Sequence, residues 1–116
     1  MTSLEFVDTI HSVVLEAAVQ DTLKLANRPP GRRPDVDLVE LSTWFNKLPD
    51  TDRARVTQML NAVAYHAVFG FLCVLDGVRA VEPLGPKGYF ELRFVKEGKE
   101  NVLSGPKGGV LHELLK

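Results

Sequence analysis

The sequence has a single cysteine and almost no net charge, and both shortages exclude classes of protein. The one cysteine, Cys73, rules out an intramolecular disulfide and leaves no cysteine pair for a zinc site. It lies within an apolar run, where a thiol behaves as a small hydrophobic side chain. The formal net charge of −1 provides no overall field to attract nucleic acid or an anionic membrane, so we expect neither as a partner.

We expect neither a targeting segment nor a membrane span in this sequence. The first residues, MTSLEFVDTIHSVV, include Glu5 and Asp8 and no basic cluster, which is unlike a secretory signal. The longest nearly apolar run extends over residues 60–75, about 16 residues, whereas a membrane-spanning helix needs roughly 20. We therefore expect a cytoplasmic protein.

No stretch of the sequence has the spacing of a catalytic or metal-binding motif. The three histidines, His11, His66 and His112, are far apart, and no HExxH pattern occurs. Gly-Pro-Lys-Gly is found at 85–88 and again at 105–108, but neither copy has the spacing of a phosphate-binding loop, and we interpret both as turns. These patterns predict no cofactor, no metal and no catalytic residue, and they favour a non-catalytic protein over an enzyme.

What the sequence does contain is helical periodicity over its first two thirds. Its 116 residues fit one globular domain, residues 1–116. Apolar residues recur at helical spacing from Ser3, which we expect to cap the helix, until the Pro-Pro-Gly cluster at 29–31. A second helix is predicted over residues 35–48, between a capping aspartate and a proline.

The third helix, predicted over residues 52–76, is the strongest element. Every residue from 67 to 75 is apolar or glycine, and a helix that is apolar all round is buried all round. We therefore expect this helix to be central and Phe71 to lie in the core. Just beyond it, Asp76 and Arg79 are expected to form an ion pair that closes the following turn.

Beyond the long helix, the period changes to that of a strand. The alternation predicts a strand over residues 89–95, a return strand over 101–104 and a final helical turn over 110–115. A lone hairpin is marginally stable in water, so this one must pack on the helices or pair with a second copy. The fold class is thus α+β: a three-helix core around a buried central helix, with a C-terminal β-hairpin and a short terminal helix. A homodimer and a monomer are equally compatible with this fold.

A basic segment separates two acidic stretches of the chain. It contains Arg28, Arg32 and Arg33, and guanidinium groups suit carboxylates, phosphates or an acidic protein surface. The alternative, which we favour, is a solvated basic turn that neutralises its acidic neighbours. Trp44 is a candidate interface anchor because tryptophan is enriched in binding hot spots, although a core position is favoured for it.

Four further residues are candidates for a pocket between the long helix and the hairpin. Tyr65 and His66 are polar-tipped residues on the mostly apolar helix, and Arg79 and Arg93 follow it. If buried, the phenol and the imidazole each need a hydrogen-bond partner, and we favour a satisfied core histidine for His66. A pocket in which these side chains converge would indicate a small-molecule-binding protein or an enzyme.

The C-terminal half also carries a resemblance. The stretch FGFLCVLDGVRAVEP, followed by GYFELRFVKEGKENVLSGPKGGVLHELL, resembles small uncharacterised bacterial proteins, among them immunity and accessory proteins of toxin loci. The resemblance implies a protein partner and transfers no site residue. Together with the scattered reactive groups, it favours a non-catalytic, self-associating bacterial protein-binding module over the small-molecule-binding alternative.

Overall fold

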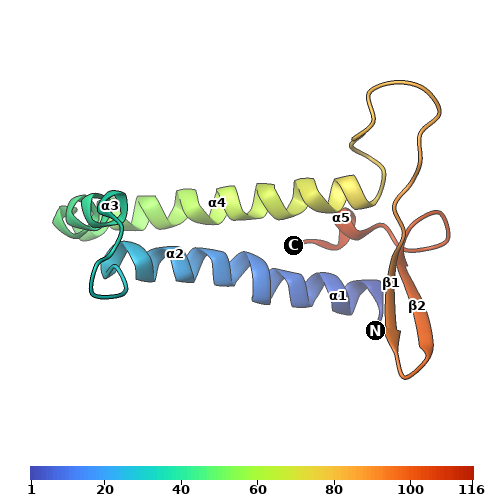
Figure 1. Ribbon diagram of the computed structural model, residues 1–116, viewed down its shortest axis with the longest axis horizontal. Helices are drawn as coiled ribbons and strands as arrows, with labels where there is room; N and C mark the ends of the chain where they lie inside the picture. The colour runs from blue at the N-terminus through green and yellow to red at the C-terminus, as the bar shows by residue number, and fades with distance from the viewer. The chain divides into compact units, whose positions relative to one another are not determined.

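The computed structural model describes residues 1–116 and has an α+β fold, as the sequence predicts (Figure 1). The chain forms, in order, α1 (Ser3–Ile10), the π-helix η1 (His11–Glu16), α2 (Ala17–Asn27), α3 (Val36–Lys47), α4 (Asp50–Leu75), β1 (Leu92–Lys96), β2 (Lys99–Ser104) and α5 (Leu111–Leu114). Residues 1–14 and 66–116 form one compact unit, which we name the terminal unit. Residues 15–65 form a second, the middle unit.

The chain enters α1 through a capping box that begins one residue before the predicted cap. The Thr2 hydroxyl accepts a hydrogen bond from the Glu5 N–H (3.1 Å), and the Glu5 carboxylate accepts one from the Thr2 N–H (2.9 Å). Ser3, expected to be the cap, is instead the first helical residue. Its hydroxyl donates to the Leu103 carbonyl (2.7 Å), which fastens α1 to β2 within the terminal unit.

A π-helical turn interrupts the first helical segment. In η1 the backbone hydrogen bonds reach five residues along the chain instead of four, which rotates the side chains that follow. Val13 and Val14 are consequently exposed, whereas Leu15 and Val19 are buried. The regular periodicity predicted for this segment is therefore wrong across η1, because it assumes 3.6 residues per turn throughout.

The C-terminal end of α4 is closed by glycine in the left-handed conformation. Gly77 has φ +76°, and the Val78 N–H donates to the Cys73 carbonyl (2.9 Å), one of the two bonds of a Schellman cap. Just before this cap, Leu72 and Cys73 are buried in the terminal unit. The sequence placed this helix end within one residue of where it occurs.

The expectation that α4 is a buried central helix is wrong. Only Gly70, Leu72 and Cys73 are buried on it, and Phe71 is 63% exposed. An apolar composition allows a helix to be buried on every side. It does not show that other elements of the same chain pack against each side. This chain covers one side of the C-terminal half of α4 and leaves Phe71 in contact with water.

By length and composition alone, α4 is sufficient to cross a membrane. Its most apolar window has a mean hydropathy of 1.5, and 22% of that window is buried within the protein. The core helix of a soluble protein meets the same criterion, so this property does not identify a membrane protein.

The predicted β-hairpin is present, with a shorter first strand than expected. β1 pairs antiparallel with β2 from Lys96↔Lys99 to Leu92↔Ser104, with a bulge beside Leu92. The connecting Glu97 and Gly98 both have positive φ, as a tight hairpin turn requires. The end of β2 is buried and contacts α1, so the hairpin packs on the helices of its own unit.

In the middle unit, α2 and α3 are joined by a stiff turn and by polar contacts. The Asp35 carboxylate caps α3 by accepting from the Asp37 N–H (2.8 Å). The Asn27 carbonyl at the end of α2 accepts a hydrogen bond from Asn46 Nδ2 (2.9 Å), and the Ser42 hydroxyl is buried beside it. Polar residues, and not only an apolar stripe, therefore fix α3 against α2.

Candidate functional site

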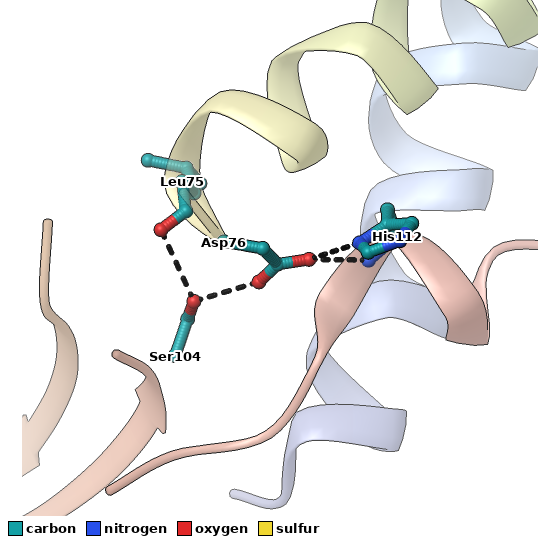
Figure 2. Close-up of polar contacts among 4 residues, drawn as sticks. All are labelled: Leu75, Asp76, Ser104 and His112. Atoms are coloured by element: carbon teal, nitrogen blue, oxygen red, sulfur yellow. Dashed lines mark hydrogen bonds and ion pairs between the residues drawn. The ribbon is translucent and has the colours of Figure 1, made fainter. Parts of the chain in front are cut away.

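The most connected polar group of the terminal unit is the carboxylate of Asp76, directly after α4 (Figure 2). Its Oδ1 accepts a hydrogen bond from the Ser104 hydroxyl (2.8 Å), and its Oδ2 accepts one from the backbone N–H of His112 (2.8 Å). The Nδ1 of His112 lies 2.7 Å from the same Oδ2. These three residues, which we name the Asp76 network, join the end of α4 to the end of β2 and to α5.

The hydrogen bonds of the network favour the charged form of the carboxyl group. Burial, the largest single influence, acts to raise the pKa of Asp76 because it removes water from the charged form. The hydrogen bonds donated by His112, Leu111 and Ser104 act together in the opposite direction and hold that pKa below its ordinary value. Asp76 is therefore an anion at neutral pH, although its side chain is only 3% exposed.

The Asp76 network contains the residue types of a nucleophilic hydrolase but not their order of contacts. In a catalytic triad, the carboxylate orients the imidazole and the imidazole takes the proton of the serine. Here the Ser104 hydroxyl donates to the carboxylate itself, and Ser104 is fully buried. The His112 ring packs edge-on against Phe69, with ring centroids 5.7 Å apart. This arrangement fastens three segments together and does not prepare a nucleophile.

Sequence reasoning did not identify this network. It paired Asp76 with Arg79, and that prediction is wrong because Ser104 and His112 occupy the carboxylate. The partners are 28 and 36 residues away, so no local spacing connects them. One signal in the sequence points to such a network. A carboxylate just after a helix lies at the negative end of the helix dipole, so it needs hydrogen-bond donors from other segments of the chain.

The predicted partner-binding residues lie in the middle unit, and all of them are exposed. Arg28, Arg32 and Arg33 follow α2 and form no salt bridge with neighbouring acidic side chains. Trp44 is 51% exposed on α3, so the core position favoured for it is wrong, and the adjacent Phe45 is buried instead. A role of these four residues in partner binding stays a prediction.

The predicted pocket residues do not converge. Tyr65 is half-buried, and His66 is exposed, so the expectation of a core histidine is wrong. Arg93 projects from β1 and pairs with Glu91 and with Glu100, the latter at 2.6 Å. Hydrogen bonds to these two carboxylates raise the pKa of the Arg93 guanidinium. An exposed ion pair of this kind adds little to stability.

Arg79 does line a cavity, which we name the polar cavity. It measures about 290 Å³ and lies between the last turn of α4 and the segment 77–90. Glu82, Lys87 and Tyr89 also line it, and the Glu82 carboxylate accepts a hydrogen bond from the Gly88 N–H (2.9 Å). Of the four predicted pocket residues, only Arg79 is part of this cavity.

Neither Gly-Pro-Lys-Gly segment forms a phosphate-binding loop, and each has a backbone amide that is already hydrogen-bonded within the protein. In the second copy, the Gly108 N–H donates to the Gly105 carbonyl (3.0 Å), and the next N–H, that of Gly109, donates to Leu103 (3.1 Å). In the first copy, the Gly88 N–H faces a carboxylate, which would repel a phosphate. Nor does any group of three or more metal-ligating side chains come together.

A second cavity of the terminal unit is an apolar groove between α1 and the C-terminal half of α4. It measures about 300 Å³ and is lined by apolar side chains alone: Phe6, Ile10, Val14, Ala67, Val68, Phe71, Leu72 and Leu75. Phe71 lines this apolar groove and is still largely exposed. The sequence shows that these residues are apolar, but it does not show that water reaches Val14 and Phe71.

Known proteins provide no template for these features. No protein-family model, curated protein or solved structure matches the chain. The features that bear on function are therefore the Asp76 network, the polar cavity, the apolar groove and the exposed residues of the middle unit.

Proposed function

We propose that the protein is a non-catalytic bacterial protein-binding module that self-associates, of the immunity-like or accessory kind. The observation that carries the proposal is the amount of apolar surface left uncovered: nineteen large apolar side chains are at least 40% exposed. Single exposed apolar side chains are normal, but contiguous apolar patches mark interaction sites. Two of the nineteen, Val14 and Phe71, line the apolar groove.

The polar chemistry of the chain supports binding over catalysis. The Asp76 network uses a carboxylate, a hydroxyl and an imidazole to hold three segments together. The thiol of Cys73 is buried, so a substrate in solution does not reach it. The groups that most often act as nucleophiles are therefore engaged in the fold.

The middle unit offers a second contact area in this proposal. Arg28, Arg32 and Arg33 present three exposed guanidinium groups, and Trp44 presents a large exposed ring. Arginine and tryptophan are the residue types that dominate binding energy in protein interfaces. An acidic protein surface is the partner that this combination suits best.

The test is the size of the protein at its native abundance. A tagged chain expressed from its own locus and fractionated by size in native-host extract should elute well above its monomer mass of 12.9 kDa. The purified chain, run alone over a concentration series, shows how much of that size is self-association. Elution as a free monomer in the host extract would contradict the proposal.

A small-anion-binding protein is the second candidate, and the polar cavity favours it. Arg79 and Lys87 bring two cations to a cavity of a size that small ligands occupy, although Glu82 opposes them. Titration of the ¹⁵N-labelled chain with citrate and with inorganic phosphate should then shift the amides of residues 77–90. Arg79→Ala should abolish the shifts and Arg93→Ala should leave them. No saturable shift below 10 mM would exclude this candidate.

A further inference from the structure

We infer that the polar cavity binds a free α-amino acid with an apolar side chain, whose carboxylate pairs with Arg79 and whose ammonium group pairs with Glu82. The inference goes beyond protein binding. It rests on the second candidate function and changes the ligand from a bare anion to a molecule that carries both charges. The cavity lies between the last turn of α4 and a long loop, residues 77–91, which connects α4 to β1 (Figure 1).

The loop of residues 77–91 is fastened at both ends by one residue. None of its 15 residues is in a helix or strand. The Ser104 hydroxyl donates to Asp76 just before the loop (2.8 Å), and Ser104 pairs with Leu92 just after it. A connection of this length is uncommon in a compact domain, and compact loops whose ends meet are frequently functional. Because Ser104 holds both ends, the side chains of the loop remain available for a ligand.

The Arg79 guanidinium is positioned by a glycine of α4. Gly70 is buried, and a Cβ at that position would lie 2.6 Å from Nη1 of Arg79 and 3.4 Å from its Cζ. The guanidinium therefore lies on bare helix backbone, and this contact gives a reason for a glycine in a helix interior, where alanine is more stable. No carboxylate of the protein pairs with Arg79. A planar cation whose shape suits a carboxylate is thus left without an acceptor.

The charged groups of the cavity favour a ligand with two opposite charges. Arg79 and Lys87 are its cations, and Glu82 is its only carboxylate. The Glu82 Oε1 accepts a hydrogen bond from the Gly88 N–H (2.9 Å), and its Oε2 receives no donor from the protein. This carboxylate repels a phosphate or a dicarboxylate, whereas the two cations repel a simple amine. A zwitterion pairs with groups of both signs.

The remaining lining restricts the rest of the ligand. Val74, Val81 and Phe90 lie beside the charged groups, so an apolar side chain has apolar surface to cover. The volume of about 290 Å³ is at the lower end of the range for small-molecule sites, about 300–1,000 Å³. An α-amino acid such as leucine or phenylalanine combines the two charges and an apolar part in a molecule small enough for this cavity.

The test is titration of the ¹⁵N-labelled full chain with L-leucine and with two analogues that each lack one charge. L-Leucine should shift the amides of residues 77–91 saturably below about 10 mM, and L-phenylalanine is a second probe of the same class. 4-Methylpentanoate lacks the ammonium group, and 3-methylbutylamine lacks the carboxylate. Each analogue should bind at least about tenfold more weakly than leucine, because it loses one charge-assisted hydrogen bond.

Two variants separate the two charges of the site. Arg79→Gln should weaken the binding of leucine and of 4-methylpentanoate at least about tenfold and leave that of 3-methylbutylamine unchanged. Glu82→Gln should weaken leucine binding to a similar degree. It should tighten the binding of 4-methylpentanoate, because it removes the repulsion and keeps an oxygen for the Gly88 N–H. Arg93→Gln is the matched control, since Arg93 is an exposed arginine outside the cavity, and it should leave the binding of all three ligands unchanged.

Gly70→Ala tests the position of Arg79 without a change of charge. The new methyl group displaces only the flexible end of the Arg79 side chain, and alanine favours the helix, so thermal stability should not fall. Leucine binding should nevertheless weaken several-fold. Leucine binding at wild-type affinity in Gly70→Ala would contradict this role of Gly70.

The absence of a saturable shift with leucine and phenylalanine below about 10 mM overturns the inference. So does equal affinity for leucine and 4-methylpentanoate, or leucine binding that Arg79→Gln leaves intact. Saturable binding of phosphate or citrate without binding of the two amino acids overturns the inference and leaves the small-anion-binding candidate standing. The size of the protein in native-host extract tests protein binding alone, so the failure of that proposal is distinguishable from the failure of this one.

Discussion

Replacing Asp76 with alanine is the sharpest test of how the terminal unit is held together. The substitution removes the one carboxylate that joins α4, β2 and α5. It leaves the Ser104 hydroxyl and both His112 donors without their acceptor. The cavity left by the small side chain is minor, so the measured loss reports mainly on hydrogen bonding.

The size of the effect follows from burial. Ser104 is fully buried, and its only other acceptor, the Leu75 carbonyl, is at a marginal 3.5 Å. A buried donor without an acceptor costs about 1–3 kcal/mol, whereas the His112 ring, 15% exposed, regains some water. We therefore expect Asp76→Ala to lower the free energy of unfolding by about 3 kcal/mol.

Urea denaturation followed by far-ultraviolet circular dichroism measures this difference. Asp21→Ala, at an exposed aspartate of α2, is the control and should change the free energy of unfolding by less than about 0.5 kcal/mol. Hydrogen exchange should show that Asp76→Ala exposes the amides of α5 and the end of β2 first. A loss below about 1 kcal/mol, with the α5 amides still protected, would refute the reasoning.

The effect should also depend on pH, with a defined sign. The pKa of Asp76 is lowered in the folded protein, so its contribution is complete above the pKa of an unfolded aspartate. The contribution is lost as the pH falls through the lower folded-state value. The stability difference between wild type and Asp76→Ala should therefore shrink below about pH 4. A difference that grows on acidification would show that the sign of the pKa shift is wrong.

Three further predictions concern the packing of single residues. Leu72→Ala should lower the free energy of unfolding by about 3 kcal/mol in a denaturant melt, because Leu72 is buried. Phe71→Ala, measured at a concentration that keeps the chain monomeric, should lower it by less than about 1 kcal/mol, because Phe71 is exposed. Equal losses would contradict the observed exposures. Gly108→Ala should destabilise the protein by about 1–3 kcal/mol in thermal melts, because the new Cβ would lie 2.8 Å from the backbone of β2. Gly88→Ala should leave the stability nearly unchanged, because its Cβ would make only ordinary contacts. Thr2→Ala should lower stability by about 1 kcal/mol through loss of the capping box, and an unchanged melt would show that the first turn frays in the wild type.

The sequence was informative wherever the determinant of structure is local. The Pro-Pro-Gly cluster at 29–31 and Pro49 end helices because proline and glycine act within a residue or two of their own position. Gly77 ends α4 for the same reason, and alternation located the hairpin to within a few residues. The class α+β follows from these signals alone.

Burial and the candidate sites depend on contacts that the sequence does not contain. Phe71 and Trp44 have the composition of core residues, but exposure depends on whether another element reaches them. Likewise, the side chains of Asp76 and His112 meet only because the whole hairpin between them folds back. The π-turn at η1 is a change of helix geometry that periodicity, counted at one fixed period, does not register.

The hydrogen bond from Ser3 to Leu103 joins two residues 100 positions apart, and this separation has a consequence for synthesis. A ribosome adds about 5–20 residues per second, so α1 leaves it roughly 5–20 seconds before β2 and α5 can arrive. During that interval α1 lacks its contacts with β2 and α5. The nascent chain must therefore wait with a partly uncovered N-terminal helix, which exposes it to aggregation or to chaperone binding until β2 and α5 are made.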